Sequence, residues 1–212
     1  MEKLQQEEKI VQEDEVPLLY LSSYDYYTED GKFIRHFPIQ KGNITAKNVM
    51  YYTPGSGFTL VFNDLLRQMM VLQCTPGNEM HDKWMIRGAT CFGKIVYDPR
   101  STARHIRYEN SVTAEDAGNT NLLIHFVKDE LLSDTAIKAK EYLKYYYDVF
   151  SEKMSKSDRE TMEVFIKEPA GFFGWLRKVL YPHRLRMRLS GELALRFLFY
   201  WGNIKKRLLY NE

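Results

Sequence analysis

The 212-residue chain has little cysteine, glycine or proline. Its two cysteines, Cys74 and Cys91, make neither a disulfide framework nor a zinc site, which favours a reducing compartment. Glycine and proline number 12 and 7, so collagen-like and low-complexity chains are excluded. Aromatic residues make up 14% and the net charge is only +2, which excludes disorder of the whole chain. Length and composition predict one folded domain, or a domain with an appendage.

Long apolar runs and targeting signals are missing as well. The longest apolar run, residues 193–201, contains Arg196 and is about half of the roughly 20 residues that a membrane-spanning helix needs. Residues 1–8 are mostly Glu, Gln and Lys, whereas a signal peptide has a basic start and an apolar core. We therefore expect a cytoplasmic protein that is not integral to a bilayer.

Charge is distributed unevenly along the chain. Residues 1–30 hold nine acidic and two basic residues, and residues 172–212 hold nine basic and two acidic ones. This asymmetry predicts that the C-terminal segment meets an anionic partner. The alternative is an ordinary solvated helical surface. Nucleic acid is not the expected partner, because no helix-turn-helix, RNA-recognition or zinc-finger pattern is present.

Turn signals and apolar periodicity predict an α/β first part, residues 1–115, and a helical second part, residues 116–212, which is basic from residue 172. Asp98-Pro99-Arg100 is predicted to be a turn, and Gly93 a helix stop. The expected strands are residues 18–22, 33–37, 58–62, 95–97 and 104–108. The expected helices are residues 1–14, 65–72, 83–92, one or two within 121–150, 158–167, 171–180 and 189–209.

Two short motifs could carry chemistry. His81-Asp82 precedes Trp84 at a loop-to-helix junction. The plain interpretation is that the Asp82 carboxylate caps the helix, and the functional one is a general base. A histidine such as His81 is by itself more often a structural hydrogen-bonding group. The second motif is residues 57–63, either a buried strand followed by a capping Asn63 or a strand that brings Thr59 or Asn63 to a ligand.

The order of these motifs resembles the second half of family 2 glycosyltransferases, in the bacterial rhamnosyltransferase-like branch that builds O-antigen and capsule polysaccharides. The resemblance rests on Gly57-Phe58-Thr59-Leu60-Val61-Phe62-Asn63, His81-Asp82 with Trp84, Phe92-Gly93-Lys94-Ile95-Val96-Tyr97, and residues 105–112.

The resemblance implies a partial GT-A-like mixed sheet with flanking helices. It also implies transfer of a sugar, with rhamnose the family-level expectation, from a nucleotide-sugar to a growing polysaccharide on a lipid-linked acceptor. Asp82 falls on the position of the family's catalytic base. In the family, that base deprotonates an acceptor hydroxyl as it attacks the anomeric carbon, with inversion. Substrate contacts are implied at Gly57, Thr59, Asn63, His81 and Trp84.

The chain also departs from the family pattern. Phe58 stands where the family usually has Cys, and Ile106 and Tyr108 stand where it has Arg and His. The family's nucleotide-binding half, with its metal-holding acidic cluster, is not matched in this sequence. We therefore expect Mg²⁺ or Mn²⁺ only in a complete enzyme, and a separate nucleotide-binding half as a partner.

Aromatic and basic residues alternate after residue 171. Such a segment suits the surface of an anionic membrane, here the inner face of the plasma membrane. The alternative is that its aromatic side chains pack in a core. A non-catalytic module that binds a partner or a membrane is therefore the second hypothesis for function. The expected membrane contacts are Phe172, Phe173, Trp175, Arg177, Lys178, Arg184, Arg186 and Arg188.

Overall fold

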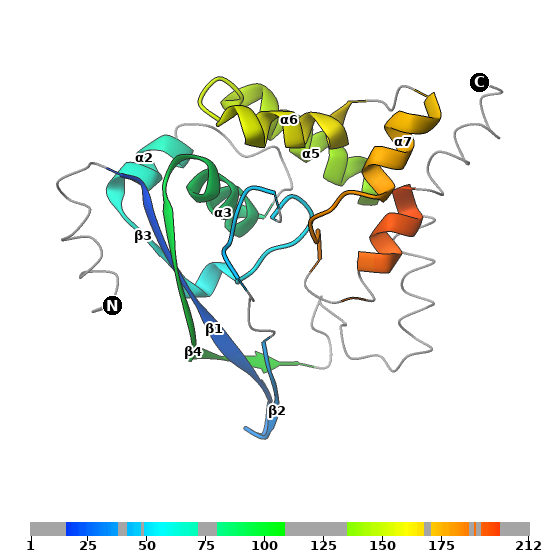
Figure 1. Cartoon of the computed structure of the whole chain (residues 1–212). Coiled ribbons are helices and arrows are strands. Elements are labelled where there is room, and N and C mark those ends of the chain that lie inside the picture. Colours follow the sequence, from blue (N-terminus) through cyan, green and yellow to red (C-terminus); the bar gives the residue numbers. More distant parts are fainter. Residues whose placement is uncertain are drawn as a thin grey trace. The chain divides into compact units, whose positions relative to one another are not determined.

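The structure is a computed structural model, and the chain divides into two compact units, residues 1–112 and 113–212 (Figure 1). The expected helix at residues 1–14 and the membrane-contact candidate Arg188 lie outside the part of the chain that the structure describes. The structure describes residues 16–37, 42–47, 49–71, 80–108, 135–167, 171–186, 189 and 192–199.

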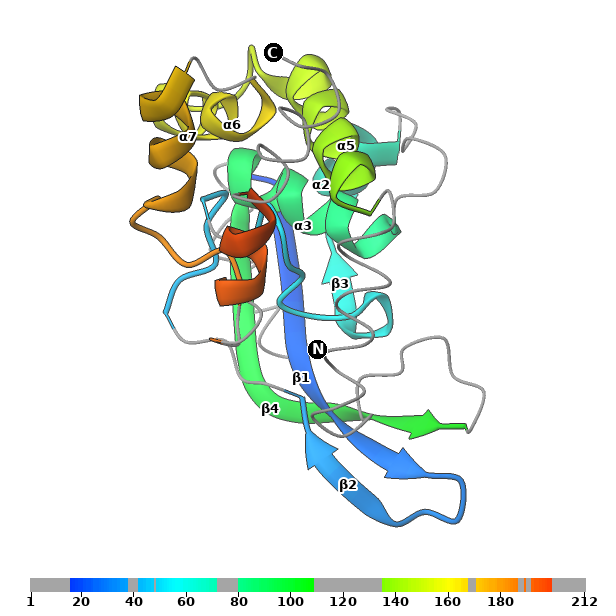
Figure 2. The ribbon, with the colours of Figure 1, turned by 90° about the vertical axis from the view of Figure 1, so that its right-hand side faces the viewer.

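A mixed sheet forms the centre of the first unit, and the expected α/β class is confirmed. Its central strand, β1, pairs antiparallel with β2 and β3 and parallel with β4. Strand β4 pairs with one edge of β1 along its whole length, so β2 and β3 both pair with the other edge of β1. Figure 2 shows β1 between β4 and β3. The strands are β1 (Leu18–Thr28), β2 (Phe33–His36), β3 (Leu60–Phe62) and β4 (Lys94–Arg107).

Strand β1 is buried on both faces near its start, where Leu18 and Tyr20 alternate with Leu19 and Leu21. The strand was expected to end at Ser22, but it continues to Thr28. Side chains on one face of a strand repeat every two residues. Tyr24 and Tyr26 continue the face of Leu18 and Tyr20, are buried, and lie with their ring centroids 5.2 Å apart. These buried rings extend the strand beyond its aliphatic part.

Strand β4 replaces two expected strands and the turn between them, so that prediction was wrong. Asp98 pairs with Ser22 of β1, and Ser101 pairs with the next residue, so Pro99 and Arg100 form a bulge in one continuous strand. The buried Asp98 carboxylate accepts hydrogen bonds from the backbone N–H and the guanidinium of Arg100 and from the hydroxyl of Tyr20. The Arg100 guanidinium holds the pKa of Asp98 well below its ordinary value.

Helices α2 (Asp64–Val71) and α3 (His81–Phe92) lie between β3 and β4 in the sequence, close to where they were expected. Gly93 ends α3 as predicted, although its backbone is extended rather than left-handed. A Cβ atom at Gly93 would lie 1.9 Å from the carbonyl oxygen of Pro17, which accepts a hydrogen bond from Lys94 N at 2.9 Å. This close approach of two backbones requires a residue without a side chain.

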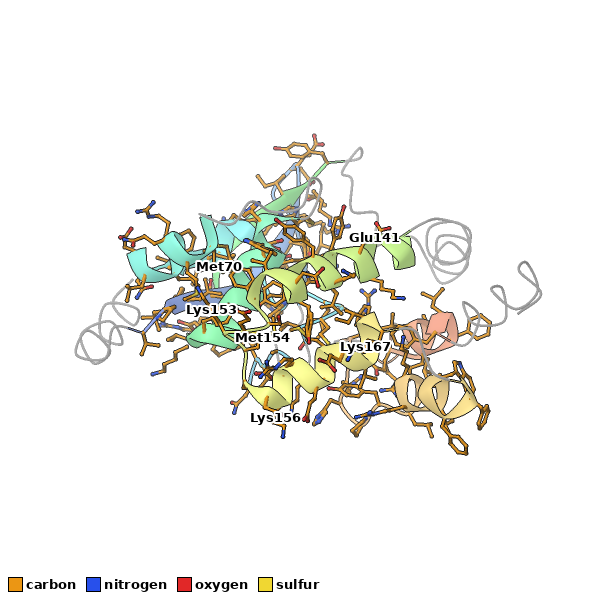
Figure 3. All side chains as sticks on the ribbon, turned by 90° about the horizontal axis from the view of Figure 1, so that it is seen from above. Met70, Glu141, Lys153, Met154, Lys156 and Lys167 are labelled. Carbon is orange, nitrogen blue, oxygen red and sulfur yellow. The ribbon has the colours of Figure 1, made fainter. Side chains whose placement is uncertain are left out.

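The second unit is helical, as expected. Ser155 caps α6 by accepting a hydrogen bond from Asp158 N, and Figure 3 shows the turn with Lys153 and Met154 that precedes it. Among the described helices, none is both long enough and apolar enough to cross a membrane. The helices are α5 (Thr135–Phe150), α6 (Lys156–Ile166), α7 (Gly171–Val179) and the helical residues 192–199.

A buried ion pair fixes the loop that follows α7. The carboxylate of Glu192 accepts hydrogen bonds from the backbone N–H groups of Leu185 and Arg186, each at 2.8 Å. The guanidinium of Arg196 bonds to the same carboxylate at 2.6 Å and to the carbonyl oxygen of Tyr181 at 2.9 Å. The helical residues 192–199 are thereby held against the loop.

Candidate functional site

The two motifs of the resemblance meet in the first unit. Gly57 begins the 3₁₀ helix η1 (Gly57–Thr59), which replaces the first half of an expected strand, and His81 is the first residue of α3. A Cβ atom at Gly57 would lie 2.3 Å from Nε2 of His81. The imidazole therefore occupies the space that a side chain at Gly57 would need, and the exposed His81 covers this glycine.

Asp82 lies in the first turn of α3 and is only 5% exposed. Its Oδ1 accepts a hydrogen bond from Lys83 N at 2.7 Å, whereas the N-cap position belongs to Met80. The carboxylate thus stands at the positive end of the helix dipole without being the cap residue. Within the described part of the chain, no lysine or arginine pairs with it. Asp82 is therefore a buried carboxylate that keeps accepting capacity for another donor.

Thr59 and Asn63 use their polar groups inside the protein. The buried Thr59 hydroxyl donates to the carbonyl of Ser56 at 2.8 Å. The Asn63 Oδ1 accepts from the backbone N–H groups of Leu66, at 3.1 Å, and Leu18, at 3.0 Å. Asn63 thus caps α2 and ties that helix to the start of β1. Both side chains support the site rather than present free polar groups to a ligand.

Trp84 belongs to the core. It is 2% exposed, and its Nε1 donates to the carbonyl of Met70 at 3.1 Å. Gly88, one turn further along α3, meets the same residue, since a Cβ atom there would lie 2.1 Å from the Met70 sulfur. Trp84 therefore anchors α3 to α2. Of the six expected residues, the structure brings Gly57 and His81 into contact, and Asp82 follows His81 in the first turn of α3.

Sequence reasoning missed an aromatic cluster that adjoins this site, made of Tyr24, Tyr26, Phe37, Phe58 and His105. Phe58 is part of η1, is 53% exposed, and stacks on His105 with ring centroids 5.5 Å apart. The rings of Tyr24 and Phe37 stack at 4.5 Å. The period-two spacing of tyrosines in residues 20–26 was the available signal.

Cationic side chains surround this aromatic cluster. The guanidinium groups of Arg35 and Arg107 lie over the ring of Tyr26, at 4.3 and 4.7 Å from its centroid. Such contacts stabilise by about 0.5–2 kcal/mol, depending on exposure. Burial, helped by the charge of Arg107, lowers the pKa of His105. The aromatic cluster therefore carries positive charge where Arg35 and Arg107 contact Tyr26.

The described carboxylates do not fit a divalent metal ion. Asp25 pairs with Nδ1 of His36 at 2.6 Å, and Asp30 accepts a hydrogen bond from the hydroxyl of Thr28. Among the residues that the structure describes, no group of three or more His, Cys, Asp or Glu side chains could hold a metal. Mg²⁺ bound beside phosphates needs at least one or two carboxylates aimed at it, and these residues do not supply them.

The expected membrane-contact residues fall into two groups. Phe172, Phe173, Arg177 and Arg184 are exposed. Lys178 is half-buried, and its Nζ donates to the carbonyl of Lys167 at 2.9 Å beyond the end of α6. Trp175 and Arg186 are half-buried. Four of the seven described residues are thus exposed.

Comparison with known proteins gives no further guide to this site: no family model matches the chain, and no match to it is found among curated proteins or solved structures.

Proposed function

We propose that the chain forms the acceptor side of an inverting glycosyltransferase with a partial GT-A-like fold. The observation that carries the proposal is the state of Asp82. It is buried, accepts a single hydrogen bond among the described residues, from a backbone N–H, and follows His81 of the Gly57–His81 contact. Among the described residues it has no cationic partner, and a buried polar group with unused hydrogen-bonding capacity is a candidate for a catalytic role.

In the proposed reaction, the Asp82 carboxylate takes the proton of an acceptor hydroxyl as the oxygen attacks the anomeric carbon. The bond from that carbon to the nucleoside diphosphate breaks on the opposite face, and the diphosphate leaves with the bonding electrons. Attack from the opposite face inverts the configuration of the sugar. The exposed His81 is placed to hydrogen-bond the acceptor, while Phe58 offers an apolar face beside it.

The proposal assigns the donor's diphosphate and its Mg²⁺ or Mn²⁺ to residues other than those that the structure describes. A separate nucleotide-binding half is the partner that would supply them. The nucleotide-sugar, with rhamnose as the family-level sugar, would then lie between that partner and the Gly57–Asp82 site. The acceptor is a lipid-linked saccharide at the inner face of the plasma membrane.

A non-catalytic binding module is the second candidate. Phe173 favours it, since this large apolar side chain is 81% exposed on α7, in the unit that does not contain Asp82.

The test is made in the cells that produce the protein, so that natural partners are present. Membranes from these cells are given radiolabelled UDP-, GDP- and dTDP-sugars. The measured quantity is the label that enters lipid-linked saccharide in cells with the intact gene and not in cells without it. Changing the native gene to Asp82→Asn should lower this transfer by a factor of about 10² to 10⁴, the usual contribution of a general base. Asp64→Asn is the matched control, because Asp64 is an exposed carboxylate in the first turn of α2.

The control should transfer label within about twofold of wild type, because the ion pair that Asp64 forms with Arg67 is exposed. Wild-type transfer by folded Asp82→Asn would overturn the role of Asp82. Unchanged transfer of every sugar after deletion of the gene would overturn the proposed function.

A further inference from the structure

The exposed apolar side chains of the second unit are concentrated after α6. In the described parts of α5 and α6, large apolar residues are buried or half-buried, and the exposed positions are charged or small and polar. Beyond α6 the pattern reverses. The exposed large apolar residues there are Phe172, Phe173, Leu180, Leu189, Leu193 and Phe197.

Helix α7 presents one apolar side to solvent. Phe173 and Arg177 are exposed on α7, and Leu180 is exposed directly after it. Leu180 N still donates to the carbonyl of Leu176, so the i, i+4, i+7 spacing of the three residues places them in one stripe. The inner side is fixed by Lys178, whose Nζ bonds to the carbonyl of Lys167. Rotation of α7 to bury Phe173 would break this bond, so the apolar stripe is held outward.

The helical residues 192–199 show the same arrangement. Leu193 is 61% exposed, whereas Leu195 and Leu198 are buried. Arg196 bonds to the carbonyls of Val179 and Tyr181, so this segment lies against the end of α7. Two neighbouring helices thus both leave apolar side chains uncovered. We call Phe172, Phe173, Leu180 and Leu193 the apolar tail surface.

The exposed charge of the described segment from residue 171 onward has one sign. Among the described residues from 171 onward, the only carboxylate side chain is Glu192, which is 4% exposed and paired with Arg196. Arg177 and Arg184 are exposed. The surface therefore presents apolar groups and positive charge, with no exposed carboxylate among its described residues.

We propose that the apolar tail surface docks on an anionic lipid bilayer. Phenylalanine and leucine side chains would enter the boundary between headgroups and acyl chains, and Arg177 and Arg184 would meet lipid phosphates. Interfacial helices combine these two features. An anionic leaflet attracts each nearby basic residue, and carboxylates would oppose this attraction. The proposal does not depend on sugar transfer, since it uses no residue of the Asp82 site.

Sedimentation with vesicles tests the proposal on the purified full chain. Phosphatidylcholine vesicles are compared with vesicles in which about one-third of the lipid is phosphatidylglycerol, which supplies the anionic surface. Phe173→Ser should weaken binding to the anionic vesicles about tenfold, since it removes a large apolar group from the interface. Arg177→Gln should weaken it about fivefold. Phe33→Ser is the matched control, because Phe33 is also exposed but lies on β2.

The proposal is supported if wild type and Phe33→Ser bind the anionic vesicles but not the phosphatidylcholine vesicles, and if Phe173→Ser binds the anionic vesicles more weakly than wild type. Equal binding by folded Phe173→Ser and wild type would overturn it, as would equal binding to the two kinds of vesicle. A dimer in sedimentation equilibrium that Phe173→Ser dissociates would assign the surface to a second copy instead. Asp82→Asn should bind vesicles as wild type does, which separates this result from that of the transfer assay.

Discussion

The two units each bury a carboxylate, and the hydrogen bonds and ion pairs that the two carboxylates make are different. Glu192, in the second unit, accepts two backbone hydrogen bonds and pairs with Arg196. Asp82, in the first unit, accepts one hydrogen bond from the residues that the structure describes, and its donor is the backbone N–H of the neighbouring Lys83. Burial of a charge is costly unless the charge is paired and fully hydrogen-bonded. Glu192 thus contributes to the fold through its pairing, whereas the sparse pairing of Asp82 is what the proposed catalytic role would require.

A third carboxylate shows that this contrast is not simply one between the units. Asp98 lies in the same unit as Asp82 and is 1% exposed, yet it has Arg100 and Tyr20 as partners. The first unit can therefore pair a buried acid where the fold needs it. The single backbone hydrogen bond of Asp82 is a feature of its site and not of the sheet around it.

The largest effect should come from breaking the pair in the second unit. Arg196→Ala leaves Glu192 buried without its counter-ion, and loss of one partner of a buried pair costs about 3–5 kcal/mol of unfolding free energy. Urea unfolding of the full chain, followed by circular dichroism, measures this loss. Lys144→Ala is the control, because it breaks an exposed i, i+4 pair with Asp148 and should cost at most about 1 kcal/mol. Equal losses in the two variants would contradict the account of Glu192.

Asp98 should give a smaller effect that depends on pH. Because Arg100 lowers the folded-state pKa of Asp98, its stabilisation is fully present above the ordinary carboxyl pKa of about 4 and is lost as the pH falls through the folded value. Asp98→Asn should thus lower the unfolding free energy by about 1–3 kcal/mol at neutral pH. The difference from wild type should shrink below about pH 4. A difference that stays constant between about pH 2 and pH 7 would show that the charge of Asp98 is not what stabilises the bulge.

Sequence patterns predicted the elements that local signals define and missed those that partners define. The helices near residues 65–72 and 83–92 follow from capping residues and apolar spacing, and both are present. Pro99 is a turn signal in sequence, but the hydrogen bonds between Asp98 and Arg100 hold it in a bulge of β4. Whether residues 98–100 form a turn or a bulge depends on their pairing with β1, and no single segment of the sequence contains that information.

The candidate site shows the same limit. The His81-Asp82 junction was recognisable as a helix start, and the structure brings His81 to Gly57. The buried position of Trp84 and the inward bond of Lys178 depend on α2 and α6, which local sequence does not reveal. Residue type identified the candidates, and tertiary contacts decided which of them are exposed.

The central claim is that Asp82 is buried for chemistry and not for stability, and the unfolding free energy of Asp82→Asn tests it most directly. The amide oxygen of Asn can still accept the hydrogen bond from Lys83 N, and the buried charge is removed. Urea unfolding of the full chain should therefore give an unfolding free energy equal to or above that of wild type, or at most about 1 kcal/mol below it. A loss of about 2 kcal/mol or more, in the range of a lost helix cap or a broken buried pair, would contradict the claim and make Asp82 a structural residue like Glu192.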